Sequence, residues 1–448
     1  MRERLLAALM SAALLAGCGE KAKLDVAAGT GPNPELPAPN HTLLPTINMA
    51  KPAGWAPGAM PTPAPGLAVA AFASGLQHPR WLLVLPNGDV LVAESDTPQP
   101  HDQVSGFFGR LRNFVERQMM KRAGASGGSP DKIVLLRDTN GDGKADVRTT
   151  FLSGLRSPFG MALVGDTLYV ADTDALLKFP YQTGETQITA KPTKVVDLPA
   201  GPINHHWTKN VVATADGKLL YVTIGSNSNV GENGADAETG RADIWEVNPA
   251  TGEHRIFAAG LRNPNGMAWE PTTKALWTVV NERDEIGSDL VPDYLTSVQF
   301  GGFYGWPWQY WGNHPDSRVK FDKPDVLEDA TVPDYGLGPH VAALSLSFAT
   351  GEALGPHYAS GAFIGEHGSW NRKPRSGYQV VFVPFAGGNP VKGAKPEQLL
   401  GGFVTADGKA QGRPVGVVLD PKGALLVADD VGNTIWRVTA ATPVTSAK

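Results

Sequence analysis

The chain of 448 residues contains a single cysteine, Cys18, so no disulfide between two of its own cysteines can stabilise the fold. Charged residues make up 19% of the sequence, the formal net charge is -5, and no basic run or RNA-binding signature occurs. We therefore expect no nucleic-acid partner. The N-terminal region also lacks a long apolar run, because the stretch at residues 5–16 is too short to span a bilayer.

The setting of Cys18 predicts a bacterial lipoprotein signal. A charged start, MRER, precedes the short apolar run, and the LAGC sequence ending at Cys18 resembles a lipobox. Residues 1–17 would then be a signal peptide, and lipidated Cys18 would anchor the protein on the periplasmic side of a bacterial membrane. An ordinary signal peptide, or a buried helix, with an incidental cysteine is the alternative. Residues 18–65 are rich in Pro, Ala, Gly and Asn and predict a disordered tether.

The rest of the chain repeats one plan. Its many glycines and prolines, 52 and 37, are spread along the sequence and indicate many turns and short strands. Each repeat has a Gly/Pro turn, an apolar strand, a polar turn such as NG or DG, and a second strand that ends near a small or acidic residue. The six copies are residues 75–94, 154–172, 204–225, 260–282, 344–385 and 412–429, with 434–438 closing the last.

Repeats about 50 to 80 residues apart, with outer strands such as ADIWEVN at residues 242–248, fit four-stranded blades with long insertions. The sequence therefore predicts an all-β, six-bladed β-propeller over residues 66–440, followed by a C-terminal tail at 441–448. Residues 67–72 are expected to complete the last blade and close the ring. Residues 109–124 are the best helix candidate, read as a solvated lid helix, with a partner-binding or membrane-facing helix as the alternative.

Loops at one end of a propeller converge on its axis, and the turns that start the repeats belong to that end. In GPINHHWTKN, the imidazole of His206 can take a proton from a substrate alcohol near neutral pH. A hydrogen-bonded surface histidine, or metal ligation by the His205–His206 pair, is the alternative. Arg262 and Asn263 in GLRNPNG combine a carboxylate clamp with an amide donor and acceptor, unless the arginine only caps carbonyls of its turn.

Further candidates for ligand binding lie in two other loops. Residues 365–377, GEHGSWNRKPRSG, contribute Trp370, Asn371, Arg372 and Lys373, and the indole can stack on a flat ring. Arg413 lies in QGRPVG. Because an acidic protein collects these cations in one class of loop, we expect the loops to bind a polyanion.

Acidic segments suggest calcium. The sequence NERDEIGSDLVPD at residues 281–293 is dense in carboxylates, and Ca²⁺ accepts both carboxylate and backbone oxygens. Separately, DTNGDGKAD matches the first nine positions of an EF-hand loop, and Thr149 replaces the bidentate glutamate at position twelve. Weak Ca²⁺ binding and a metal-free turn both remain open for that loop. Its candidate ligands are Asp138, Asn140, Asp142, the Lys144 carbonyl and Asp146.

These motifs together resemble a known family. The stretches GLRNPNGMA, FYGWPW (residues 303–308), HHW and RPVGV are similar to those of the soluble pyrroloquinoline-quinone-dependent aldose dehydrogenases. NERD, SDLVPDY and EHGSWNR make the L-sorbosone dehydrogenase type the nearest match, and the similarity covers residues 67–438. The resemblance implies the six-bladed fold and a cofactor pair, pyrroloquinoline quinone (PQQ) with Ca²⁺, at the mouth of the channel.

The resemblance also implies residue roles. His206 would remove the hydroxyl proton while hydride moves to the quinone, and Arg262 with Asn263 would face the quinone oxygens. Arg413 would bind a cofactor carboxylate. The backbone carbonyls of Asp284 and Glu285 would bind the Ca²⁺ ion. Trp370, Asn371, Arg372 and Lys373 complete the expected cofactor site.

The chain departs from the aldose dehydrogenases at three places, which leaves the substrate open. His205 stands where the family has an acidic residue, SPFG at residues 157–160 replaces a glutamine donor, and a cofactor lysine aligns only loosely with Arg372 or Lys373. The sequence predicts a sugar dehydrogenase that oxidises an aldose or a sugar aldehyde or alcohol and passes electrons to a quinone, cytochrome or dye acceptor. A Ca²⁺-dependent lactonase on a similar propeller and a non-catalytic binding propeller are the alternatives.

Overall fold

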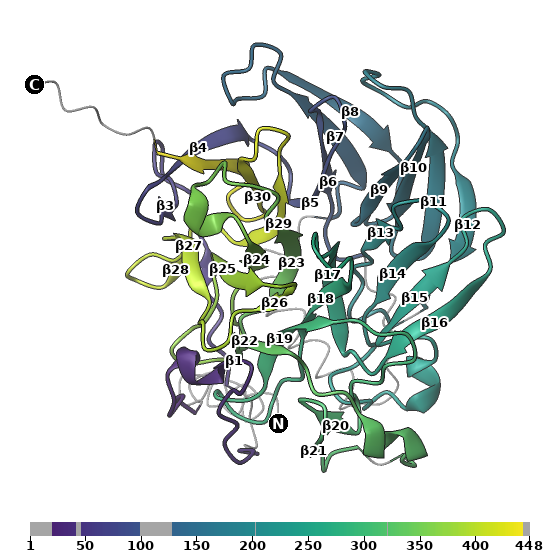
Figure 1. The fold of residues 1–448 in the computed structure, drawn as a ribbon, viewed down its shortest axis with the longest axis vertical. Coiled ribbons are helices and arrows are strands. Elements are labelled where there is room, and N and C mark those ends of the chain that lie inside the picture. Colours follow the sequence, from purple (N-terminus) through teal and green to yellow (C-terminus); the bar gives the residue numbers. More distant parts are fainter. Residues whose placement is uncertain (1–19, 42–45, 99–127, 202, 320, 442–448) are drawn as a thin grey trace, which may run out of the picture.

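Six antiparallel sheets are arranged around a common centre (Figure 1). The computed structural model describes residues 20–41, 46–98, 128–201, 203–319 and 321–441. In every sheet the first strand lies nearest the centre, and these six inner strands contact one another in a closed ring, β5, β9, β13, β17, β23, β29 and back to β5. The predicted six-bladed propeller with four-stranded blades is confirmed.

The strands of the first three blades, from the centre outward, are β5 (Pro79–Val84), β6 (Val90–Glu94), β7 (Lys132–Arg137), β8 (Val147–Ser153); β9 (Met161–Val164), β10 (Thr167–Ala171), β11 (Ala175–Pro180), β12 (Thr193–Asp197); and β13 (Val211–Ala213), β14 (Leu220–Ile224), β15 (Asp243–Val247), β16 (His254–Ala259). Those of the last three are β17 (Asn263–Trp269), β18 (Leu276–Asn281), β19 (Pro292–Ser297), β22 (Tyr335–Pro339); β23 (Ala343–Phe348), β24 (Gly361–Glu366), β25 (Gln379–Ala386), β27 (Glu397–Gly401); and β29 (Pro414–Leu419), β30 (Leu425–Asp429), β31 (Thr434–Ala440), β4 (Leu67–Ser74).

Small elements complete the described chain: β1 (Thr30–Gly31), β2 (Lys51–Pro52), β3 (Thr62–Pro63), β20 (Gln309–Tyr310), β21 (His314–Pro315), β26 (Asn389–Pro390), β28 (Lys409–Ala410) and the 3₁₀ helices η1 (Val26–Gly29), η2 (Ala235–Glu238), η3 (Asp325–Asp329) and η4 (Pro356–Tyr358). No helix in the described part of the chain has the length and apolar character needed to cross a bilayer.

The Gly/Pro turn reads GL-x-x-P at residues 75–79, 154–158 and 260–264, and the backbone conformation explains its glycine. Its first glycine has φ of 69° at Gly75, 73° at Gly154 and 74° at Gly260, a left-handed conformation that glycine adopts without steric cost. The glycine that ends two of the turns allows neighbouring blades to approach. A Cβ at Gly160 would lie 2.5 Å from the backbone nitrogen of Val211 in the next blade, and one at Gly266 would lie 2.5 Å from that of Leu346. The motif therefore shapes both the turn and the centre of the ring.

The ring closes as the sequence predicts. Strand β4, which contains residues 67–72, pairs with β31 along its whole length, from Ser74 opposite Thr434 to Leu67 opposite Ala440. Within the predicted outer strand at residues 242–248, Asp243–Val247 form β15, the third strand of its blade, and β16 is the outermost. Because the first and last strands of the domain share one sheet, this blade joins the two ends of the propeller.

The hydrophobic core is divided among six clusters, one at each junction between neighbouring blades. At the closing junction, for example, Leu82 and Val92 of the first blade pack against Leu426 and Ile435 of the last, and all four side chains are at most 4% exposed. Burial of apolar area at all six junctions stabilises the ring as a unit.

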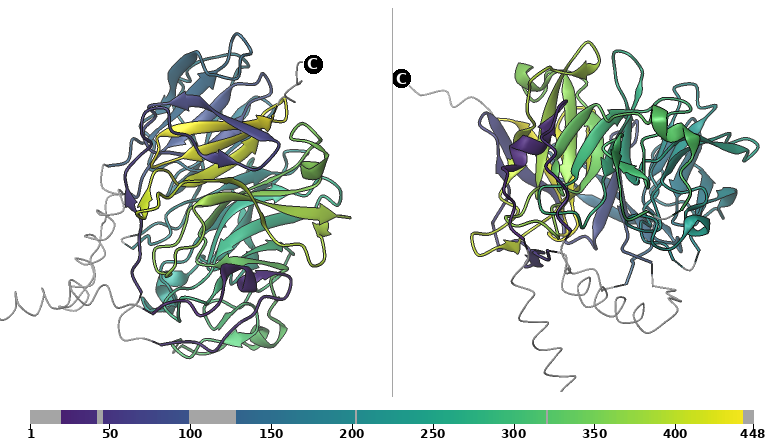
Figure 2. Two further views of the ribbon diagram at one scale, coloured as in Figure 1. Left: turned by 90° about the vertical axis from the view of Figure 1, so that its left-hand side faces the viewer. Right: turned by 90° about the horizontal axis from the view of Figure 1, so that it is seen from below.

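The expectation of a disordered tether is wrong for the residues described before the propeller, 20–41 and 46–65, here called the N-terminal strap. In Figure 2 the strap, in purple, lies against the propeller rather than extending away from it. Strand β1 adds to the fourth blade beside β22, β3 adds to the fifth beside β27, and β2 pairs with β28. Its backbone groups thus find partners in the blades, which composition considered segment by segment does not reveal.

Three sequence predictions lie outside the described residues. They are the signal peptide at 1–17 with the lipidation site Cys18, the helix at 109–124, and the tail beyond residue 441.

Candidate functional site

The predicted catalytic and cofactor-binding residues lie at one end of the ring. His206, Arg262 and Arg413 precede the inner strands β13, β17 and β29, which all start at the same end of the propeller. Loops that follow the second strands, such as residues 282–291, return to this end, here called the mouth. The structure therefore brings together candidates that are up to 207 positions apart in the printed sequence.

The His206 side chain is half-buried and has a defined orientation. Its Nδ1 lies 2.9 Å from both the carbonyl oxygen and the Oγ of Ser226. The carbonyl only accepts, so Nδ1 carries the proton and Nε2 keeps a free lone pair. Burial, followed by the positive charge of Arg262 and the proximity of His205, lowers the pKa of His206 well below its usual value. The imidazole is therefore neutral and able to accept a proton.

Arg262 and Asn263 lie directly beside this histidine. The Ser226 amide donates to the Arg262 carbonyl at 2.7 Å. A Cβ at Gly225 would lie 2.6 Å from the His206 Cβ and 2.4 Å from the Asn263 Oδ1, so only glycine permits this approach. The Oδ1 of Asn263 is buried and has no hydrogen-bond partner within the described residues. It is an acceptor that the described chain leaves unsatisfied.

The guanidinium of Arg262 is 3% exposed and is held by four groups. Its Nε donates to the Asn229 carbonyl at 3.2 Å, and Nη1 donates to the carbonyls of Asn281 at 3.3 Å and Glu282 at 2.6 Å. Nη2 donates to Asp284 at 3.0 Å. Guanidinium has five N–H groups, so one Nη2 hydrogen remains for a ligand.

The Asp284 carboxylate is the centre of a network that sequence reasoning missed, because it assigned a role only to this residue's carbonyl. Besides Arg262, the carboxylate accepts from Asn371 Nδ2 at 2.8 Å and from His340 Nδ1 at 3.2 Å. The His340 Nε2 donates to the Gly287 carbonyl at 3.0 Å. Burial raises the pKa of Asp284, but Arg262 and His340 outweigh it, and the pKa is lowered overall. The carboxylate is therefore ionised and fixes Arg262 and Asn371 together.

A second cluster at the mouth, also missed, surrounds Arg413. The backbone amide of Asp430 donates to the Arg413 carbonyl at 3.3 Å. The Asp430 carboxylate accepts from Arg80 Nη1 at 2.5 Å and from His367 Nε2 at 2.9 Å. Burial would raise the pKa of Asp430, yet the pKa is lowered because His367, His78 and Arg80 surround the carboxylate. The Nε atoms of Arg80 and Arg413 are buried and have no hydrogen-bond partner in the described chain. A detectable signal was the arginine next to proline in both HPRW and GRPVG.

Arg372 has a structural position instead of the expected cofactor contact. It is 1% exposed, and its three nitrogens donate to the carbonyls of Ser288, Pro374 and Leu24 at 2.9 to 3.0 Å. Leu24 belongs to the strap, so this guanidinium joins the strap to two loops of the mouth and is not free for a ligand. Lys373 and Trp370 are half-buried, and their carbonyls accept from the strap amides of Ala22 and Asn48.

Arg413 contacts both the strap and the mouth. Its Nη2 donates to the Ala50 carbonyl at 3.2 Å and lies 3.4 Å from the Tyr378 hydroxyl, which donates to the Ser369 carbonyl. Ser369 precedes Trp370 and Asn371 in sequence. A continuous chain of contacts therefore runs from Arg413 through this loop to Asp284, Arg262 and His206.

The proposed metal ligands are only partly arranged for an ion. The Asp284 carbonyl accepts from Asn229 Nδ2 at 3.0 Å, and the Glu285 side chain pairs with Arg318 at 2.9 Å. Among the described residues, no group of three or more His, Cys, Asp and Glu side chains that could hold a metal is present. Binding at this loop would depend on carbonyl oxygens, as the resemblance implies.

The EF-hand-like loop joins β7 to β8 at the end of the propeller opposite to the mouth. Its oxygens already accept backbone amides: Asp138 those of Gly141 and Gly143, Asn140 that of Asp142, Asp142 that of Lys144, and Asp146 that of Thr139. This arrangement is that of an Asx-rich turn, which needs no metal to be stable.

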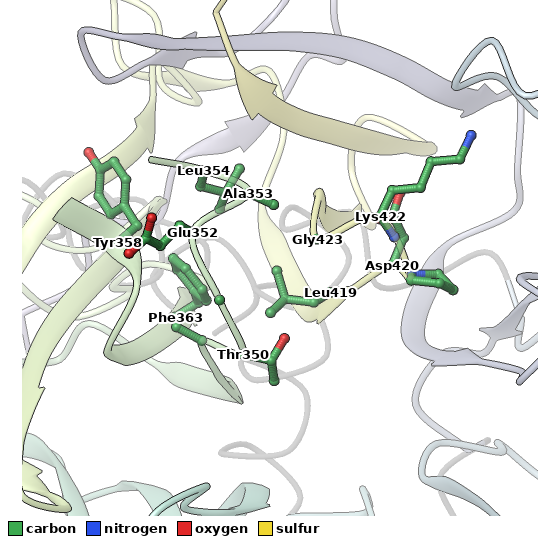
Figure 3. A pocket seen from close by; sticks show the side chains of 13 residues that line it. Thr350, Glu352, Ala353, Leu354, Tyr358, Phe363, Leu419, Asp420, Lys422 and Gly423 are labelled. Atoms are coloured by element: carbon green, nitrogen blue, oxygen red, sulfur yellow. The ribbon is translucent and has the colours of Figure 1, made fainter. Parts of the chain in front are cut away.

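A pocket of about 290 Å³ also lies at the end opposite to the mouth (Figure 3). It is formed by the loops that follow β23 and β29, and Thr350, Glu352, Phe363 and Leu419 are among its lining residues. Because none of the predicted site residues lines it, this pocket is separate from the candidate site.

A family model described as TrAA12-like matches residues 133–293 and 317–441, more than half of the chain. The chain belongs to the TrAA12-like family. Two solved structures with the same fold superimpose on most of this chain. The family AA12 enzyme of Trichoderma reesei superimposes with a TM-score of 0.68 at 18% identity, covering 88% of this chain and 99% of that one. The holo PQQ domain of pyranose dehydrogenase from Coprinopsis cinerea superimposes with a TM-score of 0.66 at 19% sequence identity. The match covers 87% of this chain and 100% of that domain.

Curated relatives of this TrAA12-like protein include sugar dehydrogenases. An uncharacterized protein of Borreliella burgdorferi is 26% identical over 64% of the chain and 77% of its own length. An aldose sugar dehydrogenase of Escherichia coli is 28% identical over 34% of the chain and 42% of its own length. The PQQ-dependent pyranose dehydrogenase of Coprinopsis cinerea is 22% identical over 71% of the chain and 44% of its own length. The chain spans less than half the length of these two dehydrogenases, and the narrower likeness to the L-sorbosone type stays a prediction.

Proposed function

We propose that this TrAA12-like protein is a quinoprotein sugar dehydrogenase. It oxidises an aldose, or a sugar aldehyde or alcohol, with PQQ as cofactor, and passes electrons to a quinone, cytochrome or dye. One observation carries the proposal: the free Nε2 of a neutral His206 lies beside Arg262 and Asn263 at the mouth. The names of two curated relatives and of solved neighbours support the same chemistry.

The mouth offers unsatisfied groups of the kind that a planar tricarboxylate needs. Oδ1 of Asn263 and Oδ1 of Asn371 are buried acceptors without a partner among the described residues, and the Nε atoms of Arg80 and Arg413 are buried donors without one. Burying unpaired polar groups is costly, so a ligand that pairs with them binds favourably. In this proposal Arg262, Asn263, Asn371 and Arg413 hold the cofactor.

Other residues complete the proposed cofactor site. Trp370 flanks the ring system and Lys373 supplies a further charge, whereas Arg372 supports the loop from behind. Arg80 is added to the predicted set. The Asp284 and Glu285 carbonyls are the proposed ligands of Ca²⁺.

The residues of this chain perform two tasks. His206 takes the proton of the substrate hydroxyl at Nε2, while Nδ1–H stays on Ser226 and holds the ring in place. Arg262, fixed by Asp284, places one N–H where negative charge develops. If bound beside these residues, PQQ would supply a hydride acceptor and Ca²⁺ would supply a Lewis acid.

Reconstitution tests the proposal directly. Purified protein mixed with PQQ and Ca²⁺ should gain sugar-dependent reduction of an artificial dye, together with a quinone absorbance that stays with the protein on gel filtration. Protein with Ca²⁺ alone is the control and should show neither. Hydrolysis of lactones by the Ca²⁺ form, without dye reduction by the PQQ form, would instead favour a lactonase.

We also propose that Cys18 carries a lipid anchor on the periplasmic side of a bacterial membrane, as the LAGC sequence suggests. Replacing Cys18 with serine should move the protein from the membrane fraction to the soluble periplasmic fraction, because the acylated thiol is lost. Immunoblots of the two fractions measure this. Unchanged membrane association of Cys18→Ser would contradict the anchor and leave the dehydrogenase proposal untouched.

A further inference from the structure

Two buried cations lie against the turn that carries His206, residues 203–210, here called the histidine turn. Arg241 is 6% exposed and donates to four oxygens around the turn. Its Nη1 donates to the Gly225 carbonyl at 3.2 Å, and its Nη2 to the carbonyls of Pro199 at 2.9 Å and Ala200 at 2.7 Å. Nη2 also lies 3.1 Å from Oδ1 of Asn204, within the turn itself.

Lys209 contacts the same turn from its other end. The side chain is completely buried, and its Nζ lies 3.4 Å from the His206 carbonyl and 3.3 Å from the Trp207 carbonyl. The Trp207 carbonyl also accepts from the hydroxyl of Thr173, to which Asn204 donates in turn. The carbonyls of His206 and Trp207 are therefore held by side chains rather than by a strand ladder.

These contacts are more than space filling. Within the described residues, neither cation has a carboxylate within the 4.0 Å of an ion pair, and Glu238 acts on Arg241 and Asp174 on Lys209 only from farther away. Removing an ammonium or guanidinium from water without a counter-ion costs several kcal/mol, whereas an apolar side chain of the same size costs nothing of this kind. Burial lowers the pKa of Lys209 well below its usual value and that of Arg241 to about 10. Two unfavourable charges at one turn point to a role that needs them.

We propose that Arg241 and Lys209 are positioning residues for His206: Lys209 holds the His206 and Trp207 carbonyls, Arg241 holds Asn204 Oδ1 and the carbonyls that flank the histidine turn, and together they direct Nε2 toward the mouth. The role of His206 as base rests on the proposed function. The positioning itself can be measured in protein without cofactor.

The charges that face His206 come from three elements. After burial, the pKa of the imidazole is lowered by Arg262 from the fourth blade, by His205 on the same turn and by Arg241 from the loop before β15, and only the Ser226 carbonyl raises it. Two carboxylates lie near these groups: Glu238 accepts from the Asn227 amide and the Ser228 hydroxyl, and Asp284 is paired with Arg262. Removing Arg241 should therefore raise the pKa of His206, and no neighbouring group replaces its charge.

The first measurement uses apoprotein labelled with ¹⁵N-histidine, with the His206 signals identified by their loss in His206→Ala. In wild type we expect a neutral ring protonated at Nδ1 throughout the accessible acid range. In Arg241→Gln the ring should become charged at a higher pH. In Lys209→Met the Nδ1 proton should exchange faster, because the turn is no longer held.

The second measurement is the pH profile of kcat/KM in the reconstituted enzyme. A base that protonates more readily loses activity on the acid side, so Arg241→Gln should lower kcat/KM at pH 5 by about threefold to tenfold more than at pH 8. Lys209→Met should lower kcat with little change in KM for sugar. Arg241→Lys and Lys209→Arg keep donors and charge and should restore most of either loss.

Matched controls donate to backbone carbonyls elsewhere. Arg148 donates to the carbonyls of Ser74 and Gly75, and Lys178 to that of Pro249, and neither hydrogen-bonds to the histidine turn. Arg148→Gln and Lys178→Met should leave both measurements unchanged. An unaltered His206 titration in Arg241→Gln together with an unaltered exchange rate in Lys209→Met, in proteins with wild-type melting temperatures, would overturn the proposal. Failure of wild type to oxidise sugar would refute the dehydrogenase and leave the apoprotein measurement decisive for the positioning.

Discussion

Replacing His206 with alanine should lower sugar turnover by about 10²- to 10⁴-fold, the usual contribution of a general base. The reason is local, because Nε2 of the neutral ring is the free proton acceptor beside Arg262 and Asn263. Cofactor affinity should change little, since the buried donors and acceptors assigned to the cofactor are other side chains. Stopped-flow reduction of the reconstituted enzyme measures turnover, and titration of the quinone absorbance measures affinity.

Two variants sharpen this experiment. His206→Gln keeps a hydrogen bond to Ser226 but has no group that accepts a proton near neutral pH, so it should be as inactive as alanine. His254→Ala removes a histidine that stacks on Trp245 at the outer strand β16 and should retain full turnover. Undiminished turnover in His206→Ala would remove this residue from the mechanism, and an equal loss of cofactor affinity would make it a binding residue.

The propeller was predictable because its signals are local. Three of the blades begin with a left-handed glycine, at Gly75, Gly154 and Gly260, and most repeats continue with a hairpin whose turn chemistry can be recognised within about 20 residues. Six copies of this unit predict a ring of six blades. The apolar segment at residues 67–72 precedes the first copy, so it is left over to complete the last blade, where it pairs with β31. The end of the propeller that carries His206, Arg262 and Arg413 follows from the same repeat, because equivalent turns face one direction.

The contacts within the mouth were not predictable, because they join residues far apart in sequence. The partners of Asp430 come from another blade 350 positions earlier and from a loop 63 positions earlier. Arg372 illustrates the resulting error, since a cation in a loop suggests ligand binding until its three carbonyl partners are known. Asp284 shows the opposite error, a functional side chain that was overlooked. It is one of several carboxylates in NERDEIGSD, and nothing in the neighbouring sequence distinguishes it from the others.

The strap shows where composition fails as a guide. Residues 20–65 have few apolar side chains in a periodic pattern, which is typical of disorder for a segment on its own. The strap is instead stabilised by hydrogen bonds to the surface of the propeller. The propeller presents guanidinium donors from the buried Arg372 and Arg413 and the half-buried Arg375, and the strap supplies the carbonyls of Leu24, Asn48, Met49 and Ala50. Neither half of this match can be read from one segment.

A chain that begins at Gly66 should therefore be strongly destabilised relative to one that begins at Glu20. Its buried arginines would lose their strap acceptors, and Asp429 would lose the indole of Trp55, which donates to it at 2.7 Å. Each buried polar group left without a partner costs about 1–3 kcal/mol, so the free energy of unfolding should fall by roughly 3–6 kcal/mol or the chain should fail to fold. Urea denaturation followed by tryptophan fluorescence measures the difference.

The slope of the same denaturation curves tests where the strap lies. A strap docked on the blades adds surface that becomes exposed on unfolding, so the chain from Glu20 should show the steeper dependence on urea. Trp55→Phe in this longer chain removes only one donor to Asp429 and should give an intermediate loss of stability at an unchanged slope. A free tether predicts the opposite pattern, with equal slopes and equal midpoints for the two chains. Removal of the strap also takes away the Ala50 carbonyl that holds Arg413 in position, so cofactor affinity should fall in the shorter chain together with stability. If residues 20–65 were a free tether, their removal would leave cofactor affinity unchanged.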